Sequence, residues 1–305
     1  MNIEYINSLL PPVNEMSLRN EVDRFGFSSI LANKLNKKKV PRALCNWTHG
    51  WRWWEIDNQA DIIHGSVRRM RNTVCVVTNT QQKNFLCSLG YKKVYVGGLP
   101  FAYVEKPKIN RIQGSTIVMM PKSQAENDIH SSFFKYVDFI RSNKQKFGDF
   151  VLCIFGGDAK RNEIVSYLNK YKLPYIIGAT PNDRNGMRRM ATIFSIFENC
   201  LSGTIGSHFI YAGLMGAKCG IIGPFYSPMS KGNVYNNNSI YCTELYSKKH
   251  YNWLFINSYC EAKNIEDWAK KESGTDFILK NEDLKTVLGW SFFGLVKHLL
   301  SRISL

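Results

Sequence analysis

The second half of the chain alternates short apolar runs rich in β-branched residues with segments whose apolar residues recur at helical spacing. Five runs are expected as strands, namely 115–121, 150–157, 173–179, 199–203 and 217–223. Four segments between them are expected as helices, namely 127–147, 160–171, 186–197 and 207–215. Buried strands that alternate with helices pair in parallel. The pattern therefore predicts an α/β fold with a doubly wound parallel sheet.

The first half of the chain carries the same signals less regularly. Residues 16–37 place apolar side chains at helical spacing and predict a helix. Short strands are expected at 42–47, 73–79 and 93–100. The segment 80–90 is expected as a helix that Gly90 closes. These elements predict a second, smaller parallel sheet.

The length of the chain agrees with this division. A chain of 305 residues suits two domains of about 100–200 residues each. The polar segment 106–114 is expected as the linker between them. We therefore expect an N-terminal domain over 1–112, a C-terminal domain over 113–288, and a C-terminal amphipathic helix over 289–305.

The cellular location is predicted from what the sequence lacks. No apolar run approaches the roughly 20 residues that span a bilayer. The first residues lack the basic start and apolar stretch of a signal peptide. The eight cysteines include no Cys-x-x-Cys pair and are expected to be reduced and mostly buried. These features predict a cytoplasmic protein.

The charge balance indicates a polyanionic partner. Lys and Arg number 40 against 24 acidic residues, which gives a formal net charge of +16. No acidic residue occurs between Ile62 and Val104. Such a chain is attracted to nucleic acid, to anionic lipid headgroups or to phosphorylated substrates. A solvated basic face is the alternative interpretation.

Small and polar residues follow four of the predicted strands. These are the segments MPKS (120–123), FGGD (155–158), GATPND (178–183) and SGTIGS (202–207). Ligands of open parallel sheets bind at the carboxyl ends of the strands, and those ends share one edge. The expected ligand-binding residues are therefore Lys122, Ser123, Gly156, Gly157, Thr180, Gly206, Ser207 and His208.

The segment SGTIGSH gives the sharpest of these signals. A strand is expected to end near Ser202 and a helix to begin at Ser207. Amide N–H groups at a helix start, together with the helix dipole, bind anions. Ser207 and His208 are expected to donate to a phosphate, and the alternative is that Ser207 only caps the helix. The chain has no Gly-x-Gly-x-x-Gly or P-loop motif that would indicate a dinucleotide or P-loop site.

A second candidate site lies in the aromatic loop NWTHGWRWW (46–54). His49 is a candidate general base, because the ordinary pKa of histidine lies near neutrality. Trp47 and Trp51 could stack on a sugar ring. A packed aromatic cluster with a structural histidine is the alternative. Asp158 is a candidate second catalytic or ribose-binding carboxylate, or else a residue that caps its loop.

The order of six motifs resembles a family of bacterial surface-polysaccharide (capsule and O-antigen) biosynthesis glycosyltransferases. The motifs are HGW, SLGYKKV, VGGLPFAYV, MPKS, FGGD and TIGSHFIYAGLMG, which run from about Trp47 to Pro224. The resemblance implies a GT-B-like fold of two Rossmann-like domains with parallel sheets. One motif departs from the family, because Pro121-Lys122-Ser123-Gln124 stands where relatives carry Pro-x-His-Ser. Lys122 or Ser123 would then have to replace that histidine.

The resemblance also implies the substrates. A nucleotide-activated sugar would bind the C-terminal domain, and a glycan or lipid-linked acceptor would face the N-terminal domain. A CMP-activated ulosonic acid is one candidate donor, and a UDP- or GDP-hexose is the alternative. The chain contains no Asp-x-Asp, so we expect catalysis without a metal or other cofactor. The catalytic residues would be His49 and Asp158, with Trp47 and Trp51 at the acceptor.

Two other function classes remain open at this point. The first is a sugar-nucleotide epimerase or glycerophosphate-type transferase on the same scaffold. The second is a noncatalytic basic protein that binds nucleic acid, although no helix-turn-helix, zinc-finger or RNP signature supports it. We expect no specific nucleic-acid partner.

The C-terminal segment 290–305 predicts contact with a membrane. Phe292, Val296, Leu299 and Ile303 recur on one helical face. Such a helix could lie peripherally on the anionic inner face of the cytoplasmic membrane, where a lipid-linked acceptor would be found. Packing of this helix against the two domains is the alternative.

Overall fold

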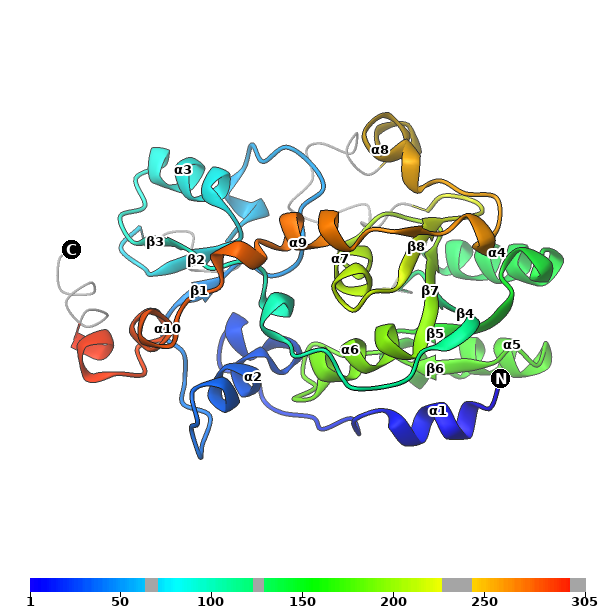
Figure 1. Ribbon diagram of the computed structural model, residues 1–305, viewed down its shortest axis with the longest axis horizontal. Coiled ribbons are helices and arrows are strands. Elements are labelled where there is room, and N and C mark those ends of the chain that lie inside the picture. Colours follow the sequence, from blue (N-terminus) through cyan, green and yellow to red (C-terminus); the bar gives the residue numbers. More distant parts are fainter. Residues whose placement is uncertain (64–70, 123–128, 227–242, 297–305) are drawn as a thin grey trace. The chain divides into compact units, whose positions relative to one another are not determined.

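The computed structural model describes residues 1–63, 71–122, 129–226 and 243–296 (Figure 1). The chain divides into two compact units, each made of three segments. Unit 1 comprises Met1–Pro12, Lys106–Thr180 and Arg188–Ala269. Unit 2 comprises Val13–Glu105, Pro181–Met187 and Lys270–Leu305.

The units are bounded differently from the continuous domains expected over 1–112, 113–288 and 289–305. Their main junction lies between Glu105 and Lys106, at the start of the expected linker. The first twelve residues belong to unit 1, and the segments 181–187 and 270–305 belong to unit 2. Hydrogen bonds between distant segments cause this difference, for example from the Met16 amide to the Asn182 carbonyl at 2.8 Å. Sequence periodicity contains no sign of such pairs.

Unit 1 is built on a six-stranded sheet with the order β6-β5-β4-β7-β8-β9. The strands are β4 (Ile112–Met119), β5 (Asp149–Ile154), β6 (Tyr175–Ile177), β7 (Phe197–Ser202), β8 (Lys218–Ile221) and β9 (Lys263–Asn264). All neighbours pair in parallel except β9, which is antiparallel to β8. The five expected strands of the second half are thus found, whereas no pattern in the sequence predicts β9.

The helices of unit 1 are α1 (Ile3–Leu9), α4 (Ile129–Ser142), α5 (Asn162–Lys170), α6 (Gly186–Ile196), α7 (Ser207–Leu214), α8 (Glu244–Tyr251) and α9 (Glu266–Ser273). Four of them, α4 to α7, alternate with its strands as predicted, whereas α1, α8 and α9 lie outside that pattern. Helices α6 and α9 each have a few residues in unit 2. In α4, the buried residues Phe133, Tyr136, Val137 and Ile140 recur every three or four positions and form one face. This face packs in the same core as buried residues of β4 and β5.

Unit 2 carries the smaller sheet, with the order β1-β2-β3 and parallel pairing throughout. Its elements are β1 (Asn46–Trp47), β2 (Cys75–Val77), β3 (Val94–Val96), α2 (Phe27–Lys34), α3 (Thr80–Ser88) and α10 (Asn281–Leu288). The prediction of an α/β fold with two parallel sheets, the N-terminal one small, is confirmed.

The helix expected over 16–37 is interrupted. A 3-10 segment over Glu21–Gly26 precedes α2, with positive φ angles of 54° at Phe25 and 78° at Gly26. A Cβ on Gly26 would lie 1.8 Å from the carbonyl oxygen of Arg184. Glycine is therefore required both by the backbone angle and by the close approach of the distant segment 181–187.

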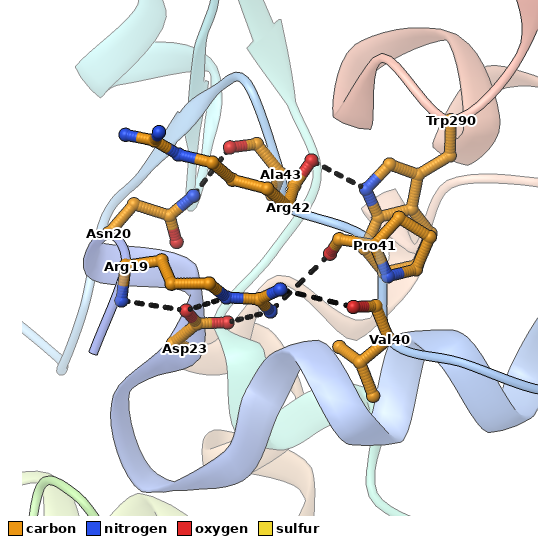
Figure 2. A network of polar contacts seen from close by, with 8 residues as sticks. All are labelled: Arg19, Asn20, Asp23, Val40, Pro41, Arg42, Ala43 and Trp290. Atoms are coloured by element: carbon orange, nitrogen blue, oxygen red, sulfur yellow. Dashed lines mark hydrogen bonds and ion pairs between the residues drawn. The ribbon is translucent and has the colours of Figure 1, made fainter. Parts of the chain in front are cut away.

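The interrupted region is fixed by an ion pair (Figure 2). The Arg19 guanidinium donates through Nε and Nη2 to the two carboxylate oxygens of Asp23, at 2.9 and 3.0 Å. Its Nη1 also donates to the Val40 carbonyl at 3.1 Å. The Asp23 side chain is fully buried, while that of Arg19 is 39% exposed. Arg19 therefore neutralises a buried carboxylate and holds the chain near residue 40.

A partly buried arginine, Arg111, stabilises unit 1. Arg111 donates to the carbonyl of Phe194 in the last turn of α6, to that of Phe197 directly after this helix, and to that of Met215 at the end of α7. The last carbonyls of a helix have no partner within the helix. Arg111 thus caps two helices, and burial of its guanidinium lowers its pKa.

We expect Arg111→Met to destabilise unit 1 by about 2–3 kcal/mol, because the carbonyls that accept from Arg111 lose their charged hydrogen-bond donor. Methionine keeps a similar side-chain volume, so the loss reports the hydrogen bonds rather than the packing. Hydrogen exchange should show earlier opening at the ends of α6 and α7. The exposed Lys108→Met serves as the control and should leave exchange unchanged. Equal protection in both variants would contradict the capping role.

Candidate functional site

The carboxyl edge of the six-stranded sheet brings the predicted loops of unit 1 together. The chain runs from β4 outward to β5 and β6, then returns to β7 on the other side of β4. In the register of β4 and β7, Met119 lies opposite Ser202. The order of strands thus reverses between these two neighbours, which is where open α/β sheets bind ligands.

Helix α7 begins directly after β7 at this edge. Its N-cap is Gly206, which has no side chain that could occupy the amides of the first turn, and Ser207 is the first helical residue. The alternative that Ser207 caps the helix is therefore wrong. The first-turn amides and the helix dipole favour an anion here.

Buried polar atoms without a hydrogen-bond partner accompany this helix start. At the helix start they are the hydroxyl oxygen of Thr204 and Nε2 of His208, and a third such atom, the hydroxyl oxygen of Thr180, follows β6 at the same edge of the sheet. Thr204 is only 5% exposed. Because buried polar groups nearly always have partners, unpartnered atoms at the ends of two strands call for an explanation. A polar ligand at this edge supplies one.

The protonation state of His208 bears directly on this site. The pKa of His208 is lowered to about 3, mainly by burial of the ring and also by the positive charge of Lys122, while a hydrogen bond with the Thr204 backbone acts in the opposite direction. The imidazole is therefore neutral at pH 7. Lys122 itself is exposed, with Nζ 5.0 Å from the centre of the Phe155 ring.

The turn after β5 is shaped by its glycines. A Cβ on Gly157 would lie 2.8 Å from the Phe155 ring, and one on Gly156 would lie 2.2 Å from Cγ2 of Thr180. The ends of β5 and β6 therefore touch at Gly156 and Thr180. Ser123, the remaining predicted ligand-binding residue, lies outside the described residues.

We expect Gly156→Ala to destabilise the chain by about 1–2 kcal/mol, because the added methyl group overlaps Cγ2 of Thr180. Thr180→Ser removes that methyl group and keeps the hydroxyl. The double variant Gly156→Ala/Thr180→Ser should therefore recover most of the loss in urea unfolding. If the double variant were as unstable as Gly156→Ala alone, this contact would not be the reason for the glycine.

Asp158 lies in the same turn but is buried, with 1% exposure at the start of the 3-10 segment Asp158–Lys160. Nε2 of His208 is also buried but has no partner, whereas Asp158 already has an interaction partner within the protein. This placement agrees with the interpretation that Asp158 holds its own loop.

The aromatic loop belongs to unit 2. Trp47 is 1% exposed, and its indole N–H donates to the Gly98 carbonyl at 2.9 Å. Trp51 is 3% exposed and donates to Glu272 at 2.8 Å. Both rings are packed in the interior of unit 2, as the aromatic-cluster alternative describes, and have no open face for a sugar.

His49 differs from the tryptophans, because its side chain is only partly buried. Its ring stacks on Phe25 with centroids 5.1 Å apart and an angle of 5° between the planes. Phe25 is the residue with positive φ that interrupts the N-terminal helix. The ring of His49 thus packs against the residue at which the N-terminal helix is interrupted.

Sequence reasoning missed two residues at this edge. They are Thr204, which lies within the segment SGTIGS, and Tyr226, and no sequence pattern predicts either as a site residue. The Tyr226 hydroxyl donates to the Met119 carbonyl at 3.1 Å and lies 2.9 Å from the Ser202 hydroxyl. These bonds tie the end of β4 to the end of β7. Tyr226 can be identified only from these contacts with Met119 and Ser202, because the sequence around it contains no motif that indicates a site.

The described residues show two further properties relevant to function. Among them, His, Cys, Asp and Glu side chains do not gather in groups of three or more that could hold a metal ion. No helix in the described ranges has both the length and the apolar character needed to cross a membrane.

Comparisons with known proteins give a distant likeness to a solved structure. No protein-family model and no curated protein matches the chain. Among solved structures, the chain is similar to the crystal structure of TarM, with 12% sequence identity and a TM-score of 0.32. The match covers 99% of this chain and 54% of TarM, so the chain spans about half the length of that protein.

Proposed function

We propose that the protein is a glycosyltransferase that binds a nucleotide-activated sugar at the carboxyl edge of unit 1. The observation that carries the proposal is the start of α7, where a glycine N-cap adjoins the buried, unpartnered atoms of Thr204 and His208. A phosphate group matches the helix dipole and the first-turn amides. Sugar and ribose hydroxyls match the remaining polar atoms.

The architecture supports the same proposal. Two units with parallel sheets are what a GT-B-like enzyme requires, one for the donor and one for the acceptor. Charge that develops on the leaving phosphate would be stabilised by the α7 start and by the cation Lys122. We therefore propose transfer without a metal, because these groups supply the positive potential that a metal would otherwise provide.

The donor is proposed at the level of chemical class. A CMP-activated ulosonic acid carries one phosphate and one carboxylate, which suits a compact anion site beside Lys122. A UDP- or GDP-hexose is the alternative donor. The acceptor is proposed to be a bacterial surface glycan or a lipid-linked precursor of it.

His49 is our candidate for the general base that activates the acceptor hydroxyl. It is partly exposed and has an oriented ring, as a base in unit 2 requires. The assay that tests this role is transfer by His49→Ala, with nucleotide affinity measured in parallel. A base would be needed for turnover and not for nucleotide binding.

A thermal-shift screen tests the proposed function. CMP, UDP, GDP and their sugars are compared, because a ligand that binds only the native state raises the melting temperature. We expect one nucleotide series to stabilise the chain and its sugar to be transferred to a glycan acceptor. Acceptor-independent conversion of the sugar nucleotide would instead indicate an epimerase. Binding of generic duplex DNA with no response to nucleotides would indicate a nucleic-acid-binding protein.

We further propose that unit 2 contacts an anionic membrane surface. Residues 292–296 are helical, and Phe292 and Phe293 are 76% and 80% exposed. The remaining part of the expected helix, including Leu299 and Ile303, lies outside the described residues. Trp290 anchors this helix by donating to the Arg42 carbonyl at 3.2 Å. Arg42 ends the basic sequence KKKVPR (37–42), so exposed aromatic rings and basic side chains occur in segments that touch.

We expect Phe292→Ser/Phe293→Ser to lower binding to phosphatidylglycerol vesicles about tenfold or more, because both rings lose their apolar contact with the bilayer. Leu245→Ser is the matched control, since Leu245 is 78% exposed in unit 1. Vesicle flotation measures the effect. Equal loss in the control, or a dimer that only the phenylalanine change dissociates, would contradict the membrane proposal.

A further inference from the structure

The two nitrogens of the His208 ring have different surroundings. A Cβ on Gly206 would lie 3.1 Å from Nδ1 and 3.2 Å from Cε1, so this part of the ring lies against the turn that precedes α7. The ring makes a hydrogen bond with the backbone of Thr204, which favours the protonated form, as a carbonyl acceptor does. The other nitrogen, Nε2, is buried and has no partner. The bond to Thr204 is therefore made by Nδ1.

This arrangement fixes the chemical character of Nε2. A neutral imidazole carries one proton, and the nitrogen that donates to a carbonyl keeps it. Nδ1 then holds the proton, and Nε2 presents a lone pair. A lone pair accepts hydrogen bonds and repels a phosphate oxygen. The expectation that His208 donates to a phosphate does not agree with this geometry.

We propose that Nε2 of His208 accepts a hydrogen bond from a hydroxyl group of the bound ligand, next to the anion that the start of α7 holds. The inference rests on the proposed function and specifies its ligand as one that carries a hydroxyl close to its phosphate. The hydroxyl belongs either to the ribose or to the transferred sugar. These two sources share the same chemistry and are separated by experiment.

Two residues thus have separate roles: Lys122 provides the positive charge, and His208 provides the hydrogen-bond acceptor. Lys122 supplies a full charge, and its proximity opposes protonation of His208. The α7 amides and Ser207 supply donors for the phosphate oxygens. His208 then distinguishes ligands by a hydroxyl, because a buried acceptor left without a donor costs binding energy when that hydroxyl is missing.

Calorimetry on the full chain tests this role of His208. The probes are CMP, UDP and GDP, their 2′-deoxy and 3′-deoxy forms, and their sugars with single hydroxyls replaced by hydrogen. We expect one missing hydroxyl to weaken binding to the wild-type chain about 5–10-fold. His208→Ala should bind all forms equally, at the affinity of the weakened wild-type complex. His208→Asn, which keeps an acceptor oxygen, should retain part of the discrimination.

Two controls make the result specific. Ser207→Ala should weaken every nucleotide by the same factor and keep the discrimination. Titrations at pH 8 in two buffers with different ionisation enthalpies should give the same heat, because His208 takes up no proton when the ligand binds. A melting temperature equal to that of the wild-type chain shows that each variant is folded.

Three results would overturn the inference. The first is an undiminished hydroxyl penalty in His208→Ala for every probe, and the second is the uptake of one proton per ligand, which would indicate an imidazolium bound to the anion. Both leave nucleotide binding, and so the proposed function, intact. The third is the absence of binding by any nucleotide to the wild-type chain, which would overturn the proposed function together with the inference.

Discussion

Replacing Arg19 with methionine is expected to destabilise unit 2 by about 3–5 kcal/mol, because it leaves a buried carboxylate without its counter-charge. The Asp23 side chain has no exposed surface and accepts three hydrogen bonds from Arg19, one of them from its backbone amide. Methionine preserves the length and apolar contacts of the arginine stem. The substitution also removes the donor to the Val40 carbonyl.

The pH dependence of stability should change sign in this variant. Burial alone would raise the pKa of Asp23, but the hydrogen bonds and positive charge of Arg19 hold that pKa below its ordinary value. In the wild-type chain this contribution is present above the unfolded-state pKa of about 3.8–3.9 and is lost as the pH falls through the lower folded-state pKa. Without Arg19, burial leaves the pKa raised, so Arg19→Met should gain stability as the pH falls toward 4.

Tryptophan fluorescence during urea unfolding reports this effect. Five of the seven tryptophans, residues 47, 51, 53, 54 and 290, belong to unit 2. The double variant Arg19→Met/Asp23→Asn carries no buried charge and should recover part of the loss. If Arg19→Met unfolded at the wild-type urea concentration, or if the double variant were less stable than the single one, the ion pair would not hold this region.

The double variant Ser207→Ala/His208→Ala should weaken nucleotide binding by about 2–4 kcal/mol, a loss of about 30–1,000-fold. One hydroxyl donor to the anion and one buried acceptor for a ligand hydroxyl are removed together. Both residues stand at the start of α7, where Gly206 already provides the N-cap, so helix stability should change little. Lys248→Ala/Lys249→Ala on α8 is the control, because it removes two exposed charges elsewhere in unit 1.

Local sequence patterns predicted the elements whose formation depends on their own residues. The spacing of Phe133, Tyr136 and Ile140 gave α4, and apolar runs gave the parallel strands of both sheets. The helix expected over 16–37 failed because Gly26 meets Arg184, which is 158 positions away in the chain. Periodicity carries no information about such a contact.

The position of the candidate site was predictable from local sequence, but the burial of its side chains was not. The strand-glycine-helix order pointed to the α7 start, and the residue types there were read directly from the sequence. Burial could not be read, so the sequence did not separate exposed tryptophans from packed ones, and Trp47 proved to be interior. Nor could it show that Nε2 of His208 lacks a partner, since that depends on how the ring packs against its own turn.

The most direct test of the central claim is calorimetric titration of CMP, UDP, GDP and their sugars into the wild-type chain and into Ser207→Ala/His208→Ala. If the carboxyl edge of unit 1 binds a nucleotide sugar, the wild-type chain binds one nucleotide series and the variant loses at least about 30-fold in affinity at an unchanged melting temperature. Equal affinities in the two proteins, or no binding of any nucleotide by the wild-type chain, would contradict the claim.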